Sequence, residues 1–201
     1  MVSIQITESS DDGRADDGLY GHIYSTIAVG WNNTYGMNSW VRFPGVNIPR
    51  KSIISVAYLR VRVQSKVGNG ASLEIFAEDA ESPTYPTSLV DYNARVPTTN
   101  YVSWSISESS GYVNSPSLVS VVQEIIDKYT CGSMQFLLKG TGAGVNFTGL
   151  RAVDNYPADS ATLFVEYTPA PAGGAGRLIG GKSHLIGGPS PLIGGPSPLI
   201  G

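Results

Sequence analysis

Apolar residues recur at every second position in short runs along most of the chain, and this spacing restricts what it can fold into. The clearest run is 59–64, where Leu, Val and Val alternate with Arg, Arg and Gln. Further runs of this kind lie at 73–77, 102–106, 134–138 and 163–167. Successive side chains of a strand point to opposite faces, so each run predicts a strand with one buried and one solvated face. Only 14% of the residues are charged, and turn-forming clusters separate the runs. We therefore predict an all-β fold, an antiparallel jelly-roll-like β-sandwich.

One segment, about residues 115–130, has helical spacing instead. Its apolar residues follow one another at steps of three and four. Ser115 is a suitable N-cap, Pro116 suits the first helical position, and Gly132 follows the expected end. We expect a single short helix that lies across the sandwich.

The C-terminal part differs in composition from the rest. We divide the chain into a sandwich domain at 1–168, a Pro- and Gly-rich linker at 169–176 and a repeat tail at 177–201. Leu-Ile-Gly recurs every seven residues in the tail, and the aliphatic pairs are Leu178 and Ile179, Leu185 and Ile186, Leu192 and Ile193, and Leu199 and Ile200. Aliphatic pairs separated by Gly and Pro cannot build a core alone, so we expect the tail to need a partner.

Three roles for the tail are open. It can form a small solenoid, or act as a strap whose Leu-Ile pairs enter similar apolar pockets on neighbouring subunits, or serve as a flexible spacer. A strap suits a particle or filament, where identical pockets recur by symmetry. We therefore expect its partners to be further copies of this chain, other proteins of the same particle, or both.

Charge and composition argue against several functional classes. The net charge is −3, and no cluster of Lys and Arg is interleaved with aromatic residues, so we do not expect nucleic acid binding. No apolar run approaches the roughly 20 residues of a membrane span. The N-terminal residues lack the pattern of a signal peptide, which predicts synthesis in the cytoplasm without export through one. Cys131 is the single cysteine, so no intrachain disulfide is possible.

The order of the predicted elements points to a known family. The residues that carry the resemblance are Trp40 to Phe43, the Ala57 to Val61 strand, the Ala77 to Ala80 segment, the Ser-Pro-x-Leu opening of the helix, and Leu163 to Tyr167. Over roughly residues 3–168 the chain resembles the DNRLRE-type β-sandwich, which is close to a carbohydrate-binding module family and occurs in tailed-phage virion and surface proteins. The resemblance implies a β-sandwich displayed on such a particle.

One loop is the best candidate for a sugar-binding site. Sugar-binding faces combine flat aromatic rings with amides that bond to hydroxyl groups, and the segment 31–38 supplies Trp31, Asn32, Asn33, Tyr35 and Asn38. The alternative is a turn in which Trp31 covers the edge of the sandwich. Three tyrosines, at 85, 92 and 101, are candidates for a second platform.

An acidic stretch near the N-terminus is a candidate metal site. Asp11, Asp12, Asp16 and Asp17 supply hard carboxylate oxygens of the kind Ca²⁺ prefers. Their spacing is not that of an EF-hand, and turn formation by Asp-Gly pairs is the alternative. Calcium is the one cofactor that we consider.

Catalytic constellations are weak in this sequence. The two histidines, His22 and His184, have no Gly-x-Ser-x-Gly nucleophile elbow to work with. Glu78, Asp79 and Glu81 contain the pair of carboxyl groups that a glycosidase needs, and the strand alternation places Glu78 on the solvated face. Since any β protein of this size offers such pairs, we predict that the chain is not an enzyme.

These observations predict a non-enzymatic structural protein of a phage particle or similar extracellular assembly. Its sandwich would be displayed, as in a capsid decoration, head-fibre or tail component, and its repeat tail would anchor or oligomerise it. The alternative is a carbohydrate-binding module that contacts host or environmental glycans.

Overall fold

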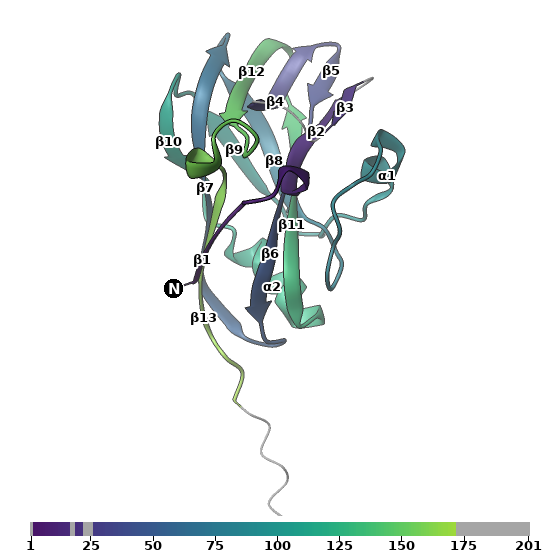
Figure 1. The fold of residues 1–201 in the computed structure, drawn as a ribbon, viewed down its shortest axis with the longest axis vertical. Coiled ribbons are helices and arrows are strands. Elements are labelled where there is room, and N and C mark those ends of the chain that lie inside the picture. Colours follow the sequence, from purple (N-terminus) through teal and green to yellow (C-terminus); the bar gives the residue numbers. More distant parts are fainter. Residues whose placement is uncertain (1, 17–18, 22–25, 172–201) are drawn as a thin grey trace, which may run out of the picture.

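The computed structural model describes residues 2–16, 19–21 and 26–171, which form two antiparallel sheets packed face to face (Figure 1). Sheet A has the order β1 (Val2–Gln5), β13 (Thr162–Thr168), β7 (Ile53–Val67), β12 (Gly144–Arg151), β4 (Thr26–Asn33) and β5 (Tyr35–Met37), and β10 (Gly111–Asn114) also pairs with β7. Sheet B has the order β3 (Leu19–Gly21), β2 (Asp12–Asp16), β6 (Ser39–Ile48), β11 (Cys131–Thr141), β8 (Ala71–Ala77) and β9 (Val102–Ile106). The predicted all-β sandwich is confirmed.

The chain crosses between the sheets repeatedly. It passes from β6 in sheet B to β7 in sheet A and back to β8 in sheet B, and later from β11 in sheet B to β12 in sheet A. This alternation makes the sandwich jelly-roll-like. It also places strands that are far apart in sequence side by side, such as β1 and β13.

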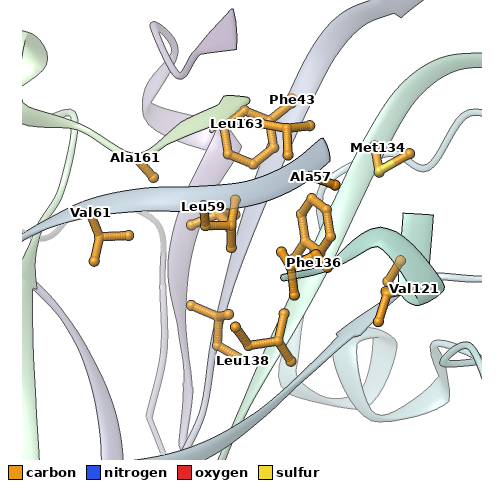
Figure 2. Close-up of a cluster of buried hydrophobic side chains, with 14 of the residues drawn as sticks. Phe43, Ala57, Leu59, Val61, Val121, Met134, Phe136, Leu138, Ala161 and Leu163 are labelled. Atoms are coloured by element: carbon orange, nitrogen blue, oxygen red, sulfur yellow. The ribbon is translucent and has the colours of Figure 1, made fainter. Parts of the chain in front are cut away.

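The core between the sheets is built from the alternating runs. The inward-facing residues of these runs are buried in it, and Leu163 and Val165 join them from β13; the inward residues are Leu59, Val61, Val63, Leu73, Ile75, Ala77, Met134, Phe136 and Leu138. Figure 2 shows part of this core, where Leu59 and Leu163 of sheet A meet Phe136 of sheet B and Val121 approaches from α2. Trp104 is also buried, as its place in an alternating run predicts.

The predicted helix is present but shorter than expected. The helix α2 spans Val119–Lys128, and Leu118 rather than Ser115 occupies the N-cap position, with no side-chain cap. Ser115 has another role, because its Oγ accepts a hydrogen bond from the Leu59 N–H at 3.0 Å. The residues before α2 therefore continue along β7. Leu118, Val121, Val122, Ile125 and Ile126 of this segment are buried in the core.

A second helix was not predicted. The helix α1 spans Leu89–Ala94, and the Ser88 hydroxyl caps it by accepting from the Asp91 N–H at 3.0 Å. With its flanking loops, α1 lies against the outer face of sheet B, where Tyr92 packs on Trp40 and Leu137. Part of that face is therefore covered by the chain itself.

No residue of the repeat tail is among the described residues. Residues 172–201, including all eight predicted Leu and Ile anchors, lie outside the described residues, as do Asp17 and both histidines. In the described part of the chain, no helix has the length and apolar character needed to cross a membrane.

Candidate functional sites

The predicted aromatic cluster lies on a hairpin rather than in a loop. Trp31 belongs to β4 and pairs with Gly36 of β5, and Thr34 makes the turn between the two strands. Asn33 adopts a left-handed backbone with φ of 55°, which Asn tolerates better than most residues. The short turn therefore extends both strands through the predicted loop.

Most of the polar groups of this hairpin form hydrogen bonds within the protein. The Trp31 indole N–H donates to the Asn33 carbonyl at 2.9 Å, and the Asn32 amide donates to the Tyr35 hydroxyl at 3.0 Å. The Asn38 side chain accepts from the Gly140 N–H at 3.0 Å. The predicted sugar-binding amides thus stabilise the hairpin and its contact with β11.

Two of the predicted residues do line a pocket. Tyr35 and Asn38 border a shallow pocket of about 220 Å³ together with Leu89 and Asn93 of α1. Trp31 and Asn33 are not among its lining residues. The structure therefore divides the predicted cluster between the hairpin and this pocket.

The acidic stretch is buried and also divided. Asp11, Asp12 and Asp16 are each at most 1% exposed. Asp11 forms an ion pair with Arg42 at 2.6 Å, and Asp16 pairs with Arg14 and accepts from the Asn38 N–H at 2.7 Å. Two of the three carboxylates are therefore neutralised by arginines.

Asp12 has no such cation. One of its oxygens accepts from the Val153 N–H at 3.0 Å, and the other is buried without a hydrogen-bond partner in the described part of the chain. Burial, together with the nearby charges of Asp154 and Asp11, raises the pKa of Asp12 from 3.8 to about 7, against the lowering effect of the Val153 hydrogen bond. Among Asp11, Asp12 and Asp16, Asp12 thus has the largest pKa shift.

These contacts do not assemble the predicted calcium site. Among residues 2–16, 19–21 and 26–171, no three side chains of Asp, Glu, His or Cys are placed to hold a metal ion. Asp17, the fourth predicted ligand, lies outside those ranges. Calcium binding stays a prediction from the sequence.

Two of the three carboxylates considered for catalysis, Glu78 and Asp79, form ion pairs. Glu78, expected to face solvent, is only 8% exposed, because the loop around α1 covers it. It accepts from Arg95 at 3.0 and 3.2 Å and from the Gln135 amide at 2.8 Å. Asp79 is paired with Lys128 at 2.8 Å, whereas Glu81 is exposed. Burial raises the pKa of Glu78, and the contact with Arg95 opposes that rise.

The uncovered half of sheet B carries a polar face that the sequence reasoning did not single out. We call it the β8–β9–β11 face, and its residues are Ser72, Glu74, Phe76, Tyr101, Ser103, Ser105, Lys139 and Thr141. Strand pairing sets them in rows, with Lys139 beside Glu74 and Glu74 beside Ser103. Phe76 stacks on Tyr101 with ring centroids 5.1 Å apart, and the Lys139 ammonium lies 5.0 Å from the Phe76 ring.

This face ends in a second pocket. Ser72, Ser105 and Thr141 line a polar pocket of about 340 Å³ where β8, β9 and β11 meet their turns. Of the three tyrosines considered as a platform, Tyr101 is half exposed on the β8–β9–β11 face and Tyr92 is buried against Trp40. The β8–β9–β11 face could have been found from the sequence, because its polar residues occupy the outward positions of the alternating runs.

The outer face of sheet A is different, because its polar groups bind one another. Asp159 pairs with Arg62 at 3.0 Å and with Arg151, and it accepts from the Tyr112 hydroxyl at 2.6 Å. Arg60 lies over the Tyr112 ring at 4.2 Å. On the β8–β9–β11 face, by contrast, the side chains of Glu74 and the serines have no hydrogen-bond partner in the described part of the protein. The β8–β9–β11 face therefore has hydrogen-bonding groups to offer a ligand.

Comparison with known proteins adds no family assignment: no protein-family model matches the chain, and no curated protein sequence matches it.

Proposed function

We propose that the chain is a non-enzymatic structural protein of a phage particle or similar extracellular assembly. In this proposal the sandwich is displayed, and the repeat tail anchors it or joins copies of it. The observation that carries the proposal is the tail itself, with four Leu-Ile pairs spaced seven residues apart after the last strand of the sandwich.

Energetics indicate that the tail works through a partner. Burying one Leu-Ile pair contributes on the order of 3–5 kcal/mol, whereas ordering seven flexible residues costs about 7–14 kcal/mol. A single repeat therefore cannot hold itself in place. Where only the Leu-Ile pair of a repeat is fixed in a preformed site and its spacer is left free, most of that ordering cost is not incurred, and several such pairs on one tail add their contributions.

Ion pairing within the sandwich supports a non-enzymatic role. Glu78 is buried in contacts with Arg95 and Gln135, and Asp79 is held by Lys128. A general acid or base must be within reach of substrate and able to exchange its proton. Two of the three carboxylates first considered for glycosidase chemistry, Glu78 and Asp79, have structural partners instead.

The assembly proposal is tested by solution mass. We expect light scattering after size exclusion to give a defined oligomer or filament for the full chain. Changing Leu178, Leu185, Leu192 and Leu199 together to Ser should return it to a monomer with an unchanged melting temperature. The matched control is Ser183→Ala with Ser190→Ala, which alters the spacers only. A monomeric wild-type chain would contradict self-assembly.

Glycan binding is a second candidate, and the β8–β9–β11 face favours it. Tyr101 offers a half-exposed ring on which a sugar can stack, and Lys139, Glu74 and Ser103 offer one cation, one acceptor and one hydroxyl beside it. Such a set suits a hydroxyl-rich oligosaccharide that lies across the three strands. A glycan array probed with the full chain tests this candidate.

A pair of tyrosine variants locates any binding. Tyr101→Ala should abolish the array signal, whereas Tyr112→Ala, a similarly exposed tyrosine on sheet A, should keep it. Equal binding by both variants would place the sugar elsewhere, and Trp31→Ala would then test the hairpin.

A further inference from the structure

An apolar opening lies where the two ends of the sandwich domain meet. We call it the edge opening, and its four lining residues are Val2, Val165, Tyr167 and Pro169. Val2 pairs with Val165 across β1 and β13, which lie side by side at the edge of sheet A (Figure 1). Its volume is about 290 Å³.

The floor of the edge opening belongs to the core. Val165 is 1% exposed and is part of the core between the sheets, and Tyr167 packs against that core from the same strand. Val2 and Pro169 stand beside this floor as lining residues. A side chain that enters the opening therefore contacts apolar groups continuous with the interior of the sandwich.

We propose that the edge opening receives a Leu-Ile pair from the repeat tail of a second copy of this chain. The proposal rests on the proposed assembly function and names the surface that the tail binds. An apolar cavity of roughly 150 Å³ holds benzene in a protein interior. The edge opening is larger, so it has room for an aliphatic side chain of a Leu-Ile pair.

Charge complementarity agrees with this occupant. The edge opening is lined by no charged side chain. The last three repeats, residues 185–201, likewise contain no Asp, Glu, Lys, Arg or His. An uncharged segment loses no charge hydration on entering such a site, which favours it over a charged partner.

The position and number of the pairs favour binding between copies. The described chain ends at Pro171, two residues after Pro169, which itself lines the opening. Leu178 is nine residues beyond Pro169, a reach of about 30 Å when extended. A copy has one edge opening but four Leu-Ile pairs. At least three pairs of each tail are therefore available to openings on other copies, which gives a multivalent link.

Cysteine cross-linking in the full chain tests the contact directly. Val2→Cys is mixed with Leu185→Cys under mild oxidation, and the mixed disulfide is measured on a non-reducing gel. Cys131 is fully buried and does not compete. The matched control replaces Val2→Cys with Ile53→Cys, which is 63% exposed and outside the edge opening. We expect the Val2→Cys mixture to cross-link at least about tenfold faster.

A second pair of full-chain variants separates the two proposals. Val2→Arg should weaken self-association at least about tenfold, since an aliphatic contact is lost and a charge must be buried, whereas Ile53→Arg should leave it unchanged. If the tail drives association but Val2→Arg and the cross-linking rates match their controls, the edge opening is not the tail's site and the assembly function stands. If the wild-type chain does not associate, self-assembly and the edge-opening contact are both wrong, and the assembly function would require the tail to bind another protein of the particle.

Discussion

Changing Asp12 to Asn should stabilise the protein at neutral pH and leave its stability at acidic pH unchanged. In the folded protein, burial raises the pKa of Asp12 to about 7, whereas an unfolded chain has an ordinary carboxyl pKa of 3.8. The folded state therefore keeps a proton that the unfolded state releases between about pH 4 and pH 7. The contribution of Asp12 to the free energy of unfolding is therefore fully present below pH 4. It falls as the pH rises from about 4 and is lost once the pH has passed through 7.

The size of the effect follows from that difference. A separation of about three pH units, at about 1.4 kcal/mol each, gives up to about 4 kcal/mol. Asn has no charge to bury and keeps an oxygen that accepts the Val153 N–H. In a domain of this size, 4 kcal/mol corresponds to roughly 10 °C in melting temperature.

Thermal unfolding of the wild type and Asp12→Asn from pH 4 to pH 8 measures this. The two melting temperatures should coincide near pH 4, separate steadily up to about pH 7 and keep that separation to pH 8, with the variant more stable. Asp12→Ala is the control, because it also removes the ionisable group but loses the Val153 hydrogen bond, so its melting temperature should vary with pH as that of Asp12→Asn does and stay below it at every pH. If Asp12→Asn parallels the wild type across the whole range, the carboxyl group is ionised throughout and the reasoning is wrong.

The remaining predictions concern three further positions. Arg95→Ala leaves Glu78 buried without its cation and should lower the free energy of unfolding by about 3–5 kcal/mol in urea titrations; Arg95→Lys should recover only part of this. Gly140→Ala should prevent stable folding or lower the melting temperature sharply, because a Cβ there would overlap the Gly30 carbonyl where the two sheets approach. Burial raises the pKa of Cys131 to about 12, so iodoacetamide at pH 8 should modify it only in denaturant, as mass spectrometry will record.

The β-sandwich could be predicted because the alternation of apolar and polar residues that specifies it lies within short stretches of sequence. Side-chain alternation in 59–64 and 134–138 reports directly on which face of a strand is buried, and the structure agrees. The start of α2 was not predictable in the same way. Ser115 has a hydroxyl of the kind that caps helices. In the structure that hydroxyl instead accepts a hydrogen bond from Leu59 of β7, a strand more than 50 residues earlier in the chain.

The candidate sites were less predictable than the fold. Glu78 lies at an outward position of its strand, and only the distant loop that carries Arg95 buries it. Asp11 and Asp16 look alike in sequence, yet two different arginines neutralise them. The β8–β9–β11 face brings side chains from three separate strands together. Such arrangements depend on which strands are neighbours, which alternation alone does not specify.

The strands at the borders of both sheets are short. Sheet A ends in β1 and β5, of four and three residues, and sheet B ends in β3 and β9, of three and five residues. Long, flat border strands invite a second molecule to add itself through backbone hydrogen bonds, which leads to aggregation. Brief borders leave few backbone groups for that pairing. Copies crowded at high local concentration can therefore stay separate sandwiches, and their spacing can be governed by whatever tethers them.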